Sequence, residues 1–97
     1  MMSNIPINLA KVKKENIDKE ILRVGIIAEL DAINLYEQLA ESTENKDIKK
    51  VILDIAKEEK THVGEFQSLL LEIDEEYEKE MKDGKKEVEK MKDDDND

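Results

Sequence analysis

The stretch IKKVILDIAKEEKTHVGEFQSLLLEI, residues 48–73, decides the fold of this chain. It holds no proline and only one glycine, Gly64, and we expect one long helix here, from about Lys46 to Glu72. Eight of its positions follow alternating steps of four and three, which is the heptad pattern of helices that pack side by side. We call these positions the second seam, and two of them are polar, Glu59 and His62. The other six are Ile48, Ile52, Ile55, Phe66, Leu69 and Ile73.

Another helix is predicted earlier in the chain, over residues 17–41, with Asn16 as its N-cap. Its packing positions also follow steps of four and three and form a first seam. One of them is a carboxylate, Glu29; the others are Leu22, Ile26, Ile33, Tyr36 and Ala40. The polar stretch ESTENKD, residues 41–47, predicts a short loop between the helices. A short loop makes them antiparallel neighbours, so we expect an all-α helical hairpin.

The ends of the chain predict less regular structure. Residues 1–15, which include Pro6, are expected to form an irregular lead-in, and residues 16–75 form the hairpin. Residues 76–97 carry few apolar side chains and end in KDDDND. We expect a short C-terminal helix there, fraying into a disordered acidic tail.

Composition excludes several kinds of function. The 97 residues allow one small domain, and its formal charge of −10 disfavours nucleic acids and anionic membrane surfaces as partners. The chain has no cysteine, which excludes disulfides, thiolate metal sites and thiol catalysis. No 18-residue apolar run is present, so a cytoplasmic protein is expected. A chain this short favours oligomerisation or a bound metal as a source of stability.

The polar seam positions are predicted to meet. Glu29 lies 15 residues before Glu44, and Glu59 lies 15 residues after it. If the loop is centred there, equal offsets place both carboxylates at one level of the hairpin. His62 follows Glu59 by three residues and shares its helix face. Three potential metal ligands therefore converge.

These carboxylates lack a basic partner in either seam, and the one arginine, Arg23, lies outside them. Burying a carboxylate without a partner is costly, and a metal cation would offset that cost. Carboxylate oxygens with imidazole suit iron, manganese or zinc. Di-iron four-helix bundles take one Glu from each of two helices and one Glu-x-x-His from each of the other two. One hairpin supplies half of that set, so a two-fold dimer would complete both the bundle and the site.

The segments AELDAINLYE (28–37) and DIAKEEKTHVGEF (54–66) make the chain resemble the encapsulated ferritin family over roughly residues 17–75. The resemblance implies a half-length ferritin-like hairpin that dimerises into a four-helix bundle. It implies that Glu29, Glu59 and His62 of two subunits are catalytic metal ligands, holding two irons per dimer interface. Tyr36 and Asp31 would lie beside the ligands or on the path by which metal enters.

The activity implied by the resemblance is that of a ferroxidase, which oxidises Fe(II) to Fe(III) with dioxygen for iron storage. The implied assembly is a ring, typically a decamer of dimerised chains, inside a shell of encapsulin protein in the cytoplasm. Two features depart from the family pattern. Position 28 is alanine, which leaves only Asp31 of the acidic residues near Glu29, and the chain ends in KMKDDDND without an apolar shell-targeting peptide. A truncated chain, a fusion to a shell protein or another mode of targeting would each account for that end.

Two other functions stay open at this stage. The same ligands would hold zinc or manganese in a structural dimer without redox chemistry. A metal-free helical interaction module is the third alternative, and it leaves three polar seam residues unpaired. Gly25 and Gly64 are poor helix formers, and two alternatives stay open for them: they permit close approach of another helix, or they are simply tolerated in the helices.

Overall fold

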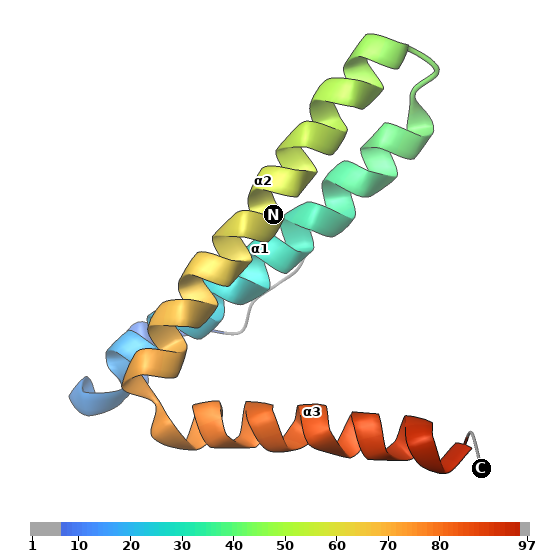
Figure 1. Cartoon of the computed structure of the whole chain (residues 1–97). Helices are drawn as coiled ribbons and strands as arrows, with labels where there is room; N and C mark the ends of the chain where they lie inside the picture. The colour runs from blue at the N-terminus through green and yellow to red at the C-terminus, as the bar shows by residue number, and fades with distance from the viewer. Residues whose placement is uncertain (1–6, 96–97) are drawn as a thin grey trace.

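The computed structural model describes residues 7–95 and is all-α, as predicted. Three helices account for most of the described chain: α1 (Ile17–Ser42), α2 (Lys46–Ile73) and α3 (Glu75–Asp95). Two short 3-10 helices, η1 (Leu9–Lys11) and η2 (Lys14–Asn16), precede them, and no strand occurs in residues 7–95. Figure 1 shows α1 and α2 side by side as an antiparallel hairpin, with α3 leaving its open end. Pro6 lies outside the described residues.

The loop of the hairpin is tight and well capped. It comprises residues 43–45, shorter than predicted and centred on Glu44. The Asn45 side-chain oxygen accepts hydrogen bonds from the backbone N–H groups of Asp47 and Ile48, each at 3.0 Å. Thr43 Oγ1 accepts one from the Asn45 N–H at 3.1 Å. These bonds satisfy the first amides of α2 and hold the two helices in a defined register.

The N-cap of α1 is Asn16, as predicted, but its side chain lacks the usual capping hydrogen bond. The chain instead enters α1 through η2, in which the Asn16 N–H donates to the Lys13 carbonyl at 2.9 Å. Asp18 and Glu20 lie in the first turn of α1, where the helix dipole favours negative charge.

Few side chains of the hairpin are fully buried, and two of them are alanines. The buried residues are Ile33 and Ala40 of α1 and Ala56 and Leu70 of α2. Ala56 and Leu70 each lie one residue after a second-seam position, a rotation of about 100° around α2. The face of α2 that is buried is therefore rotated away from the second seam. Three of its members are about half exposed: Ile48 at 49%, Leu69 at 50% and Ile73 at 45%.

We call these three residues of α2, Ile48, Leu69 and Ile73, the open seam. Near the open end of the hairpin, the last two line a shallow apolar groove of about 250 Å³ together with Ile21 and Leu22 of α1. Such an uncovered apolar stripe is typical of a surface that another helix covers.

The C-terminal helix is longer than the sequence predicted, since residues expected to form a disordered tail are helical up to Asp95. The Asp74 side chain caps it by accepting from the Tyr77 N–H at 3.0 Å. Ion pairs one turn apart then support the helix: Lys82 with Glu78 at 2.7 Å, and Lys79 with Asp83 at 3.1 Å.

Hydrogen bonds to these carboxylates raise the pKa of both lysines. The prediction of a short helix rested on the sparse apolar positions of this segment. It did not take these ion pairs into account.

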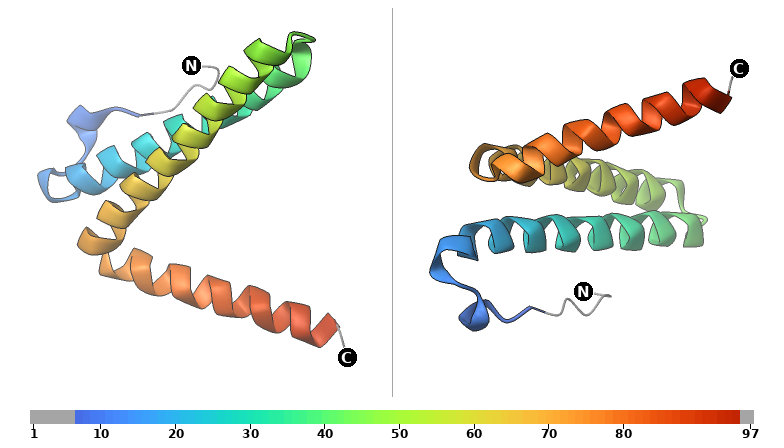
Figure 2. Two further views of the ribbon diagram at one scale, coloured as in Figure 1. Left: turned by 45° about the horizontal axis from the view of Figure 1, so that its top comes forward. Right: turned by 90° about the horizontal axis from the view of Figure 1, so that it is seen from below.

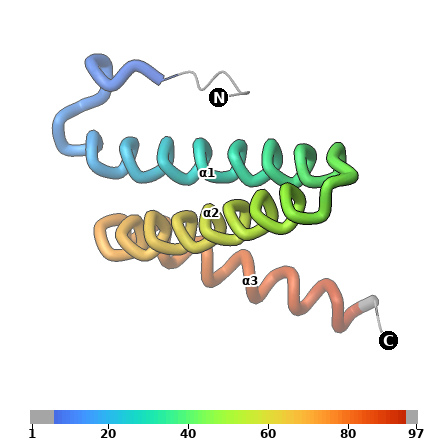
Figure 3. Tube along the Cα trace, turned by 90° about the horizontal axis from the view of Figure 1, so that it is seen from above, coloured from blue at the N-terminus to red at the C-terminus, as the bar shows by residue number. Residues whose placement is uncertain are grey.

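The other views place residues 7–16 and α3 on opposite sides of the hairpin (Figures 2 and 3). Residues 7–16 turn back along α1 on the side away from α2, and α3 starts on the α2 side and diverges from the hairpin (Figures 2 and 3). Within residues 7–95, none of the helices is both long and apolar enough to cross a membrane.

Candidate metal centre

Glu29 of α1 and Glu59 and His62 of α2 come together midway along the hairpin. Each offers one ligand atom, and these atoms all lie within 4.8 Å of one another. The loop centred on Glu44 accounts for the common level of the two carboxylates, and the three-residue spacing stacks His62 beside Glu59.

The distances within this cluster suit a shared cation better than mutual hydrogen bonds. His62 Nδ1 lies 3.6 Å from Glu29 Oε2 and 3.5 Å from Glu59 Oε2. Glu29 Oε2 is buried and has no hydrogen-bond partner. A buried carboxylate oxygen without a donor is costly, and a bound cation satisfies it. The donor set of two carboxylates and one imidazole therefore fits a metal such as iron, manganese or zinc.

Basic side chains do not neutralise the cluster. Lys60, the neighbour of Glu59, pairs instead with Glu37 at 3.1 Å. Arg23 pairs with Glu20 at 3.0 Å and reaches Asp74 at 4.0 Å. Over residues 7–95, the ion-pair contacts of the cluster carboxylates are with His62 alone.

The cluster is accessible to solvent on the side of His62. The His62 side chain is 45% exposed, whereas the side chains of Glu29 and Glu59 are 20% and 19% exposed. All three occupy seam positions, so the accessible side of the cluster belongs to the same stripe as the open seam. A second protein chain covering that stripe would also cover the candidate centre.

The other two predicted site residues, Tyr36 and Asp31, lie at other positions of α1 than Glu29 and outside the cluster. Tyr36 follows Glu29 by seven residues, which places it about two turns along α1, where it is half-buried. Asp31 is also partly buried but follows Glu29 by two residues, and residues so spaced do not share a helix face. Asp31 is not a member of the three-residue cluster.

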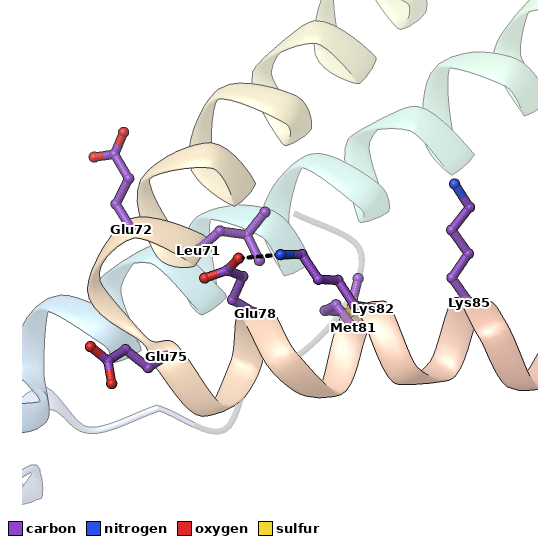
Figure 4. A pocket seen from close by; sticks show the side chains of 7 residues that line it. All are labelled: Leu71, Glu72, Glu75, Glu78, Met81, Lys82 and Lys85. Atoms are coloured by element: carbon purple, nitrogen blue, oxygen red, sulfur yellow. Dashed lines mark ion pairs between the residues drawn. The ribbon is translucent and has the colours of Figure 1, made fainter.

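The groove at the corner of α2 and α3 is larger but holds none of the predicted ligands. Its volume is about 550 Å³, and Figure 4 shows Leu71 and Met81 among charged side chains there, with the Glu78–Lys82 ion pair. Among the described residues, the group of side chains that could hold a metal ion is the cluster of Glu29, Glu59 and His62 instead.

One Glu on one helix and one Glu-x-x-His on the other match half of the ligand pattern of ferritin-like carboxylate proteins. Comparison with known families agrees with this class: the rubrerythrin family model matches residues 20–94, so the chain is a member of this ferritin-like family. The crystal structure of the encapsulated ferritin domain from Pyrococcus furiosus superimposes with a TM-score of 0.79 and 50% sequence identity, covering 93% of this chain and 94% of that one. The chain belongs to the encapsulated ferritin family.

Two curated relatives carry names from the same context. The ferritin-like–encapsulin shell fusion protein of Pyrococcus furiosus is 57% identical over 72 residues, which are 74% of this chain. The encapsulin nanocompartment cargo protein EncC of Myxococcus xanthus is 40% identical over 53 residues, or 55% of this chain. The matched regions span 21% and 41% of those two proteins, respectively.

Proposed function

We propose that this protein is a ferroxidase that oxidises Fe(II) to Fe(III) at a di-iron centre formed between two copies of the chain. One observation carries the proposal. Glu29, Glu59 and His62 place their ligand atoms within 4.8 Å of one another, and the buried Glu29 Oε2 has no hydrogen-bond donor. Membership of a ferritin-like family supports iron as the metal.

A second copy is needed because one hairpin is an incomplete site. Three protein ligands on one open side leave the metal exposed to solvent, and ferritin-like di-iron sites use ligands from four helices. A two-fold axis beside the stripe that bears the cluster would bring a second Glu29, Glu59 and His62 to face the first. The half-exposed open seam would be buried in the same step. Dimerisation thus accounts for the exposed apolar stripe and the half set of ligands together.

In this proposal iron is the substrate, and the side chains bind it and favour its oxidised form. Neutral imidazole and carboxylate oxygens are suitable ligands for Fe(II). Two Fe(II) ions each give up one electron to one dioxygen molecule, which takes up two protons from water and leaves as hydrogen peroxide. The carboxylates of the two subunits form an anionic cage, which stabilises the more highly charged Fe(III) over Fe(II). The apolar seam residues on either side keep bulk water away from this cage.

We further propose that the oxidised iron is stored inside an encapsulin nanocompartment in the cytoplasm. The relatives named for an encapsulin shell and its cargo support this setting. A ring of dimers, such as a decamer, is the assembly proposed within the shell. The encapsulin shell protein is then the second partner of this chain, beside further copies of itself.

The proposed activity is tested by mixing Fe(II) with the protein in air and following the ferric absorbance by stopped flow. The rise is expected to be at least about 10-fold faster than in protein-free buffer, because the centre holds two irons beside each other. The same protein preincubated with Zn(II) serves as the control, since zinc competes for the ligands and has no redox chemistry. A rise no faster than in buffer would instead favour a structural dimer held by zinc or manganese.

A further inference from the structure

Phe66 of α2 lies directly against the backbone of α1 at Gly25. A Cβ atom at Gly25 would stand 3.2 Å from two carbons of the Phe66 ring and 3.3 Å from a third. This confirms close approach of another helix at Gly25, the first of the two alternatives. The other glycine of the hairpin differs, because a Cβ at Gly64 would meet nothing within 4 Å.

This contact is immediately beside the candidate metal centre. Gly25 precedes Glu29 by one turn of α1, and Phe66 follows His62 by one turn of α2. The glycine and the ring therefore occupy the next level of the hairpin, on the same faces as the ligands. The ring lies between the two helix backbones and limits how closely they approach at that level.

We propose that Gly25 and Phe66 are positioning residues that set the separation of Glu29 from His62, and thus the geometry of the metal centre. This assignment builds on the proposed function, since it presumes that the cluster binds metal. A methyl group at position 25 would push the Phe66 ring, and α2 with it, outward by a few tenths of an ångström. Metal–ligand distances tolerate only about 0.2 Å, so such a shift weakens binding.

Metal affinity and helix stability should respond to Gly25→Ala in opposite directions. Alanine is a better helix former than glycine, so the substitution favours α1 itself. Gly64→Ala favours α2 in the same way but meets no neighbouring atom. Gly64→Ala is therefore the matched control, because it makes the same chemical change without displacing the Phe66 ring. A merely structural role for Gly25 would not alter the metal's coordination geometry.

The test is a titration of the whole chain with Co(II), whose visible absorption bands report ligand geometry. Gly25→Ala is expected to bind Co(II) about 3- to 10-fold more weakly than wild type, with shifted bands. Gly64→Ala should match wild type. Phe66→Leu added to Gly25→Ala should restore the affinity to within about 2-fold and return the bands toward wild type, because the smaller side chain accommodates the methyl group.

The outcomes separate this assignment from the proposed function. Wild-type affinity and bands in Gly25→Ala would overturn the assignment while leaving the metal centre intact, and so would equal changes in Gly64→Ala. A wild-type protein that binds no Co(II) would overturn the metal centre, and the positioning role with it. Circular dichroism shows whether each variant is helical. If Gly25→Ala does not fold, the single variant Phe66→Leu is the test, and unaltered Co(II) absorption bands in it would overturn the assignment.

Discussion

Glu59→Ala is expected to slow Fe(II) oxidation by about 10-fold or more, to the rate in protein-free buffer. The substitution removes a ligand from both halves of the proposed site at once. The matched control is Glu58→Ala, which deletes the neighbouring carboxylate on the exposed face of α2 and changes the net charge equally. Stopped-flow absorbance of both variants in air gives the comparison. Equal rates in the two variants would show that Glu59 has no special role.

The stability of the metal-free protein provides a second readout of the ligand positions. Glu29 Oε2 is buried without a donor, so the apo protein gains nothing from it as a hydrogen-bond acceptor. Glu29→Ala is therefore expected to leave the melting temperature of the apo protein unchanged or higher while iron binding is lost. Functional sites commonly show this opposition between activity and stability. A lower melting temperature with unchanged iron binding would indicate a structural residue.

Leu69→Lys is the second substitution with a large expected effect. Leu69 is 50% exposed in the single chain, lies on the open seam and lines the apolar groove near Ile73. If a second copy covers this stripe, the new ammonium group would be buried without a partner at the dimer interface. That costs about 3 kcal/mol or more, which raises the dissociation constant of the dimer at least about 100-fold. Iron oxidation should fall with the loss of the dimer.

Val51→Lys is the matched control for this substitution. Val51 is 59% exposed on the same helix but lies outside the second seam, so it should stay solvated in the dimer. Light scattering after size exclusion, at a series of protein concentrations, gives the mass of both variants. A dimeric Leu69→Lys protein that oxidises iron at the wild-type rate would place the interface elsewhere.

The sequence predicted the hairpin and the meeting of the ligands because both depend on local spacing. Heptad steps define the helix faces, and a loop centred on Glu44 equalises the offsets of Glu29 and Glu59. This argument tolerates an error of a few residues in the loop, since neighbouring levels of a helix are only about 1.5 Å apart per residue. Membership of the encapsulated ferritin family was also recognisable from the two segments that carry these residues.

The remaining features depend on contacts that spacing does not encode. Ala56 and Leu70 are buried, although each lies one residue past a second-seam position, and Leu69 is half exposed. Seam positions alone could not choose between these neighbours, because both are leucine. The C-terminal helix was underestimated because its support is a cap at Asp74 and ion pairs such as Glu78–Lys82, rather than an apolar core.

The central claim, that two chains together form one iron site, is tested most directly by native mass spectrometry of the intact protein with and without Fe(II) under anaerobic conditions. We expect one iron per chain, bound in assemblies that contain an even number of chains. Glu59→Ala should bind no iron in the same experiment, whereas Glu58→Ala should bind as wild type does. Iron held at the same stoichiometry by a single chain, or a stable even-numbered assembly that takes up no iron, would contradict the account.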